Sequence, residues 1–294
     1  MNSTRKIRRY NRRDTMAAWL MLSPFLIFFL LFVIYPIVMN IWYSFTNYNL
    51  DKADWVGLKN YQRLLKDKAF IAAVKNTAVY AFFSVAFLTT LGFLTASALN
   101  RSIRGIRLIR MLMIFPYATS MTAVSMIWLM MLDPTSGLVN KLLRMMDLMG
   151  VEWLFNVNTA LPCLIVVNIW KNIGYCMLIY LAGMQSIPGE IYEAATVDGA
   201  SEWKKMLHIT VPMVRPVAFF VLITTMLESF KTFDQVKLMT GGDPLYSTTT
   251  IVHQIYQRGF TEFRMGYAAA MSVVLLAIVL VVTIINYRFG SSAE

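Results

Sequence analysis

Several charged side chains lie inside long apolar stretches of this sequence, where they could act on a solute or an ion. Lys171 interrupts one apolar run, and Glu228 and Lys231 lie in a later one. A charge at the centre of a bilayer costs roughly 2.5–3.5 kcal/mol on insertion scales, so it usually faces a cavity or a partner. Glu228, Lys231 and Thr232 also have the i, i+3, i+4 spacing of one helix face. These side chains are therefore candidates for a pathway through a membrane.

Two other interpretations of these charges stay open. Lys171 could pair with Glu228, or Glu228 with Lys231, and such a pair would only hold helices together. If Lys171 has no partner, its ammonium group would favour an anionic substrate, such as an acidic sugar or a phosphodiester.

Other kinds of chemistry are disfavoured. The sequence has no G-x-x-x-x-G-K-[ST] phosphate loop and no evident Ser/His/Asp or Cys/His nucleophile set. Its two cysteines, Cys163 and Cys176, fall in one apolar run and form neither a disulfide framework nor a zinc-ligand pattern. We therefore expect no enzyme activity, no metal site and no cofactor in this chain.

The elements that must position these residues are membrane spans. The chain has 294 residues, of which 57% are hydrophobic and 15% charged, whereas a soluble domain averages about 25% charged residues. A bilayer span needs roughly 20 apolar residues. Six stretches meet this need, at residues 17–41, 76–100, 111–132, 159–184, 216–239 and 265–287. The residues 56–68 and 138–149 between spans predict short amphipathic helices.

The distribution of Lys and Arg predicts the orientation. Six spans place both termini on one side of the membrane. The N-terminus, residues 100–110, the loop 185–215 and the tail carry more Lys and Arg than the three opposite loops do. Because positive residues prefer the cytoplasmic side, both termini and the loop 185–215 are predicted to be cytoplasmic. The net charge of +11 is thus attributed to topology, and nucleic-acid binding is not expected.

The loop 185–215 carries a recognisable pattern. Glu193-Ala194-Ala195 is followed by Gly199, then by Ile209 and Pro212. This spacing resembles the EAA loop of permease subunits from binding-protein-dependent ABC importers, with Val211 where that family usually has Leu. The resemblance implies a short coupling helix that fits a groove on a cytoplasmic ATPase. The residues that it assigns to ATPase coupling are Glu193, Ala194, Ala195, Asp198, Gly199, Ile209 and Pro212.

A second resemblance narrows the family. The segments 241–244, 248–250 and 266–270, together with Tyr35-Pro36 and Val56-Gly57-Leu58 near the N-terminus, resemble the first permease subunit of maltose, multiple-sugar and glycerol-3-phosphate systems. This implies a heterodimer with a second permease, two copies of an ABC ATPase that hold ATP and Mg²⁺, an external solute-binding protein and a sugar substrate.

The same resemblance places the sugar pathway between the fourth and fifth spans. Aromatic side chains there suit the apolar face of a sugar ring, and amides and hydroxyls suit its hydroxyl groups. The predicted pathway residues are Trp170, Lys171, Asn172, Tyr175, Thr225, Glu228, Ser229 and Thr232.

We therefore predict an all-α polytopic inner-membrane protein with six transmembrane helices and the type I ABC importer permease fold. Residues 1–71 would form a basic N-terminus, the first span and an outer loop, residues 72–289 a five-helix core, and residues 290–294 a cytoplasmic tail. Two alternatives remain open. An ion-coupled secondary transporter would use Glu228 and Asp234 without needing the loop pattern, and a receptor anchor or assembly factor would transport nothing.

Overall fold

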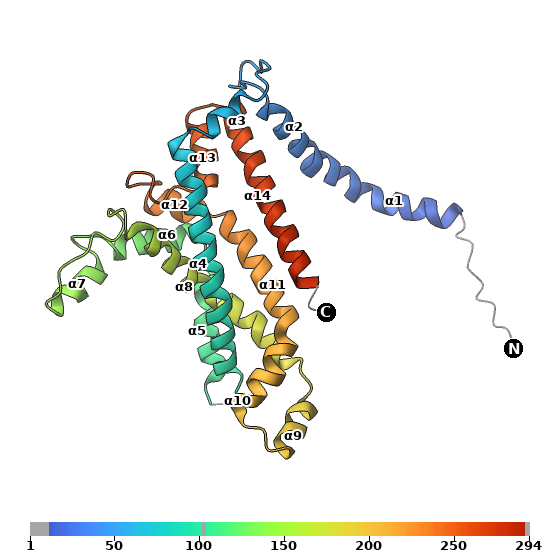
Figure 1. The fold of residues 1–294 in the computed structure, drawn as a ribbon, viewed down its shortest axis with the longest axis vertical. Helices are drawn as coiled ribbons and strands as arrows, with labels where there is room; N and C mark the ends of the chain where they lie inside the picture. Colours follow the sequence, from blue (N-terminus) through green and yellow to red (C-terminus); the bar gives the residue numbers. More distant parts are fainter. Residues whose placement is uncertain (1–11, 102–103, 292–294) are drawn as a thin grey trace.

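The computed structural model describes residues 12–101 and 104–291, and these residues form helices joined by turns and loops (Figure 1). Most of the basic N-terminus and residues 292–294 of the expected tail lie outside the described residues. The elements are α1 (Arg12–Phe29), η1 (Leu30–Ile34), α2 (Tyr35–Ser44), α3 (Lys59–Leu64), α4 (Lys68–Leu99), α5 (Ile106–Ala118), α6 (Met121–Met131), α7 (Leu138–Met145), α8 (Ala160–Gln185), α9 (Gly189–Val197), α10 (Glu202–Lys205), η2 (Met206–Thr210), α11 (Val211–Phe230), α12 (Asp234–Met239), α13 (Ile251–Tyr256), η3 (Gln257–Thr261) and α14 (Met265–Ser291).

Membrane-spanning helices dominate the described part of the chain. Five of them are long and apolar enough to cross a bilayer, and they cover Thr15–Ser44, Lys68–Leu99, Ala160–Gln185, Glu202–Phe230 and Met265–Arg288. A sixth span is counted if α5 and α6 together form one crossing. The predicted helical membrane architecture is thereby confirmed, and a count of six spans fits it.

The third predicted span is not one straight helix, because α5 and α6 meet at an angle of 96°. Thr119 and Ser120 between them have extended backbone conformations. Ser120 then starts α6, since its hydroxyl oxygen accepts a hydrogen bond from the Ala123 N–H at 3.2 Å. An N-cap serine in the middle of an apolar run was the local signal for this break.

The fifth span also differs from its prediction at both ends. The helix begins at Glu202, after Ser201 caps it by accepting a hydrogen bond from the Lys204 N–H. Pro212 lies inside the continuous stretch Glu202–Phe230, ten residues after the helix begins. The wide turn η2 ends two residues before Pro212, and the Val211 N–H closes it by donating to the Met206 carbonyl. A proline lacks the N–H of an α-helical hydrogen bond, so a wide turn accommodates it.

The helical bundle is built around α4, α8 and α11, which pack along one another. Small residues allow the close approach of α5 to α8. A Cβ atom on Gly174 would overlap the backbone carbonyl of Met113, and neither backbone can move aside cheaply. The span Thr15–Ser44, by contrast, extends away from the body of the bundle, and none of its apolar window is buried (Figure 1).

Gly174→Ala is therefore expected to prevent normal packing of α5 on α8. Overpacking typically costs about 1–3 kcal/mol, and a clash with backbone atoms lies at the upper end. The thermal unfolding midpoint of the purified protein, followed by tryptophan fluorescence, should fall by several degrees. Gly189→Ala is the matched control, because a Cβ there meets no atom within 4 Å. An unchanged midpoint in Gly174→Ala would contradict this packing.

Candidate functional site

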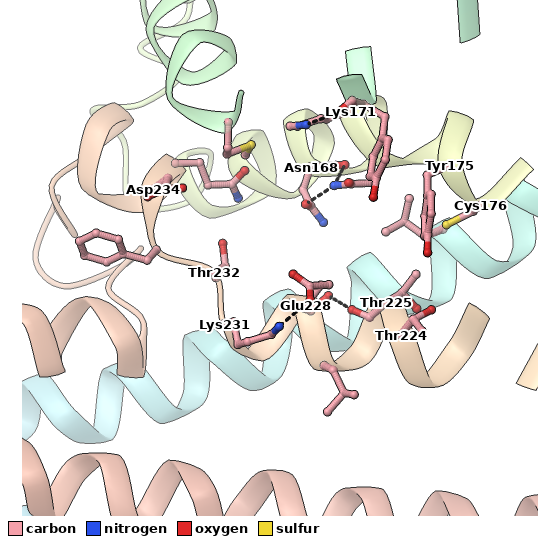
Figure 2. Close-up of a pocket in the computed structure, with 18 residues that line it drawn as sticks. Asn168, Lys171, Tyr175, Cys176, Thr224, Thr225, Glu228, Lys231, Thr232 and Asp234 are labelled. Carbon is pink, nitrogen blue, oxygen red and sulfur yellow. Dashed lines mark hydrogen bonds and ion pairs between the residues drawn. The ribbon is translucent and has the colours of Figure 1, made fainter. Parts of the chain in front are cut away.

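A cavity of about 460 Å³ lies between α8 and α11, close to the break between α5 and α6. Figure 2 shows polar side chains of α8 on one side of it and those of α11 on the other. Most of its lining residues are polar or charged, and the full set is Leu88, Tyr117, Met121, Asn168, Lys171, Asn172, Tyr175, Cys176, Thr224, Thr225, Leu227, Glu228, Ser229, Lys231, Thr232, Phe233, Asp234 and Gln235.

The α8 wall presents amides beside an aromatic pair. The Asn172 amide nitrogen donates to the Asn168 side-chain oxygen at 2.8 Å, so the two side chains hold each other in place. Tyr175 stacks on Tyr117 with 4.6 Å between ring centroids and 15° between planes. Aromatic faces beside amide groups can contact the apolar and hydroxyl surfaces of a sugar, respectively.

The opposite wall contains an ion pair at the end of α11. The Lys231 ammonium lies 2.5 Å from the Glu228 carboxylate, and both side chains are more than half exposed. The helix ends at Phe230, so Thr232 does not continue the helical face predicted for it. The freed Thr232 carbonyl accepts a hydrogen bond from the Thr250 hydroxyl at 3.1 Å. This contact with a distant segment stabilises the break, and Thr232 lies beside the cavity in Figure 2.

Lys171 makes a different set of contacts from those considered in the sequence. Its ammonium group donates to the backbone carbonyls of Pro116, Tyr117 and Thr119, at 3.4, 3.0 and 2.9 Å. These carbonyls lie at the end of α5. That of Pro116 also accepts from the Thr119 hydroxyl at 2.6 Å, whereas no following helical turn can satisfy those of Tyr117 and Thr119. Lys171 is buried and forms no ion pair with Glu228 among the described residues. The cost of placing this charge within the bilayer is thus offset by the hydrogen bonds that hold the bend between α5 and α6.

The predicted pathway residues are not all brought to the cavity. Trp170 faces an apolar hollow between α4 and α8, and its ring meets that of Trp128 edge-on with 5.5 Å between centroids. Thr225 and Ser229 do line the cavity, but their hydroxyls donate to the carbonyls of Val221 and Thr225 at 2.7 Å. Asn172, Tyr175, Glu228 and Thr232 also line it.

The sequence prediction missed several residues that line the cavity, among them Asn168, Thr224 and Tyr117. Asn168 lies one helical turn before Asn172, so its i, i+4 spacing was a usable signal. Thr224 directly precedes the predicted residue Thr225, and a second polar residue within the same apolar run was also a usable signal. Tyr117 comes from α5 and meets Tyr175 only through the tertiary fold, so no local pattern pointed to it.

The loop pattern is presented on a short helix at the opposite end of the bundle from α13 (Figure 1). The helix α9 exposes Glu193 and Ala194, while Ala195 is half-buried. Asp198 and Gly199 follow it and are exposed, and Gly199 has a φ of +75°, which glycine adopts without strain. The Tyr192 and Thr210 hydroxyls lie 2.8 Å apart and join α9 to η2.

The end of the loop is tied to the bundle. Ile209 packs, half-buried, against the apolar core formed by α4, α8 and α11, and Pro212 is exposed on the long helix. Two large apolar side chains beside the pattern, Val197 and Trp203, are 88% and 71% exposed. They were not singled out from the sequence, and they extend the apolar surface that α9 offers.

The comparisons with known proteins define the class of this protein. Residues 88–293 match the family model described as the binding-protein-dependent transport system inner membrane component, so the chain belongs to this family. It is a membrane permease component of an ABC importer, and not an enzyme.

Individual relatives are similar along nearly the whole chain. It is 31% identical over 278 residues to the sn-glycerol-3-phosphate transport system permease protein UgpA of Yersinia pestis, covering 92% of both chains. It is 33% identical over 276 residues to the protein of that name from Brucella suis biovar 1, covering 92% of this chain and 93% of the relative.

Among solved structures, it resembles a chain of a bacterial ABC transporter that imports the acidic polysaccharide alginate. The TM-score is 0.85, the identity is 27%, and 96% of each chain is covered. The predicted importer permease fold is confirmed.

Proposed function

We propose that this chain forms one half of the translocation pathway for a neutral sugar or short oligosaccharide. The observation that carries the proposal is the cavity between α8 and α11, with its stacked tyrosines and paired asparagine amides. The relatives' names point to glycerol-3-phosphate and alginate, both anionic. In this chain, however, Lys231 is paired with Glu228 and Lys171 is bound to carbonyls, while Asp234 adds a negative charge. The cavity therefore offers no free cation for an anionic solute within the described residues.

The second half of the pathway belongs to a different, homologous permease. The span Thr15–Ser44 has none of its apolar window buried, and the apolar hollow beside Trp170, about 520 Å³ in volume, lies between α4 and α8. Both features support pairing with another subunit. Two copies of an ATPase that binds ATP and Mg²⁺ would engage α9 through Glu193, Ala194, Ala195, Asp198 and Gly199, and an external binding protein would deliver the sugar to the α13 end. Both termini would then be cytoplasmic, as the Lys and Arg distribution supports.

Tyr175→Ala is expected to lower ATP-driven uptake of neutral sugars about tenfold, equivalent to 1.4 kcal/mol. The substitution removes one ring of the stacked pair that lines the cavity. The measurement is uptake into proteoliposomes that contain the complete importer, with binding protein outside and ATP inside, using a panel of labelled neutral and acidic sugars.

Phe155→Ala is the matched control, since it also removes an aromatic ring, and that ring is exposed in the loop before α8 and lines neither the cavity nor the apolar hollow. It should leave uptake within about twofold of the wild type. Equal losses in the two variants, or faster uptake of acidic than of neutral sugars by the wild type, would contradict the proposal. Uptake driven by an ion gradient without ATP would instead favour a secondary transporter.

A further inference from the structure

A second polar cavity, about 230 Å³ in volume, lies at the α13 end of the bundle. It is enclosed by the loop after α12, by α13 and by η3, and its lining includes Gly242, Asp243, Tyr246, His253, Gln254 and Arg258. It shares no lining residue with the cavity between α8 and α11. Phe233, which lines that other cavity, packs against the His253 and Tyr256 rings with centroids 6.5 and 5.0 Å away. The two cavities are therefore separate.

Three side chains of this second cavity are each anchored at one end and unpaired at the other. His253 Nε2, Gln254 Oε1 and Arg258 Nε are buried without a hydrogen-bond partner. The side chains do not rotate freely, because the Gln254 amide nitrogen donates to Thr249 Oγ1 at 2.9 Å and His253 Nδ1 lies 3.0 Å from the same oxygen. The Arg258 guanidinium contacts Glu262 at 2.6 Å and Asp67 at 3.6 Å. Leaving a buried polar atom unpaired is unfavourable, and a bound group that pairs with it would remove this cost.

The hydrogen-bond chain limits what these unpaired atoms can do. Thr249 Oγ1 accepts from Gln254, and it either donates to His253 Nδ1 or accepts from it, according to the ring tautomer. His253 Nε2 is a donor in the first case and an acceptor in the second, whereas Arg258 Nε is a donor and Gln254 Oε1 is an acceptor. Burial and the nearby charge of Lys237 lower the pKa of His253, which keeps the ring neutral. A hydroxyl group both donates and accepts, so it matches this set.

The charges around the cavity favour a neutral group over an ion. Asp243 and Glu262 line it and oppose an anion, and Arg258 and the nearby Lys237 oppose a cation. Asp67, from the start of α4, contacts Arg258 and accepts a hydrogen bond from the Tyr267 hydroxyl, so its charge is already compensated.

The rim of the cavity carries an aromatic ring on a strained loop. Leu245 and Tyr246 have φ values of 51° and 62°, a left-handed conformation that is costly for residues with side chains. The Asn76 amide holds this loop by donating to the Tyr246 carbonyl at 2.7 Å. The Tyr246 side chain remains half-exposed beside the polar lining. Strain of this kind gathers at ligand sites.

We propose that this cavity is a second carbohydrate subsite, which binds one neutral sugar ring or a polyol through His253, Gln254 and the Tyr246 ring. Its volume lies below the range of about 300–1,000 Å³ typical of drug-sized ligands, which fits a single small unit. The subsite rests on the proposed sugar function, since it would hold a sugar at the outer mouth before the main cavity.

The test is saturation-transfer difference NMR on the complete importer in nanodiscs, with glucose and glycerol as probes and glycerol-3-phosphate as an anionic comparison. Wild-type importer should give signals for glucose and glycerol that exceed the signal for glycerol-3-phosphate. His253→Phe with Gln254→Leu removes the hydroxyl partners and should reduce the neutral signals at least threefold. Tyr246→Ala alters an exposed ring and should reduce the glucose signal. If the double variant fails to fold, the glucose signal of Tyr246→Ala alone tests the subsite.

Asn172→Leu is the matched control, because it changes the main cavity only. It should lower ATP-driven uptake and leave most of the signal intact. Signals that are equal in the wild type, the double variant and Tyr246→Ala would overturn the subsite, and uptake of sugar would then show that the proposed function survives without it. A signal that depends on His253 and Gln254 in an importer that transports no sugar would leave the subsite standing and remove the proposed function.

Discussion

Glu193→Lys combined with Gly199→Asp is expected to abolish ATP-driven uptake, to less than a tenth of the wild-type rate. The first change reverses the charge of an exposed side chain on α9. The second places a side chain at a φ of +75°, which costs about 1–2 kcal/mol for a residue with a Cβ. It also disturbs the turn in which the Ala200 N–H donates to the Ala195 carbonyl at 2.9 Å. The surface that α9 presents would change in both charge and direction.

The measurement is uptake in proteoliposomes together with the amount of ATPase subunit that co-purifies. Both should fall in the double variant. The thermal unfolding midpoint should fall by no more than a few degrees, because neither residue is buried and the backbone strain at Gly199 is the one added cost. Glu152→Lys makes the same change of charge at an exposed site in the loop between α7 and α8, and it should leave uptake intact. Full ATPase recovery with the double variant would show that α9 is not the coupling element.

Lys171→Met is expected to destabilise the permease by about 2–4 kcal/mol, because at a buried position it removes the donor to the Tyr117 and Thr119 carbonyls and one of the donors to the Pro116 carbonyl. The methionine side chain is of similar length but cannot donate a hydrogen bond. The unfolding midpoint should therefore fall, and cysteine pairs placed across the bend between α5 and α6 should cross-link less uniformly than in the wild type.

Lys171→Arg provides the control, since a guanidinium group can donate to the same carbonyls and should recover most of the midpoint. Neutral and acidic sugars should lose uptake in the same proportion in Lys171→Met. A selective loss of acidic sugars with an unchanged midpoint would show that Lys171 contacts the substrate, as the sequence had left open.

The long helices could be predicted because length and apolarity decide them, and the loop pattern because it is contiguous. The breaks depend on other information. Ser120 was a readable N-cap between α5 and α6, but residues 231–233 contain no Gly or Pro. The end of α11 is stabilised by Thr250, a residue from another segment. Such a break follows from tertiary contacts and was hidden from local patterns.

In the candidate site, too, some residues could be predicted from local sequence and others depended on tertiary contacts. Polar residues within apolar runs marked Asn172, Tyr175 and Glu228, which do line the cavity. The partner of Lys171 could not be found, because backbone carbonyls carry no sequence signal. Trp170 could have been separated from Lys171, since adjacent residues on a helix point about 100° apart and do not share a face.

The wide turns η1 and η2 have a mechanical consequence. Each ends two residues before a proline, Pro36 in the first span and Pro212 in the long helix that follows α9. A wide turn holds one more residue than an α-helical turn, and the proline removes one hydrogen bond beyond it, so the helix bends there at low cost. Each of these two helices therefore carries a compliant joint. A force on α9 would therefore tilt the segment from Glu202 to η2 before it displaced the remainder of the helix up to Phe230.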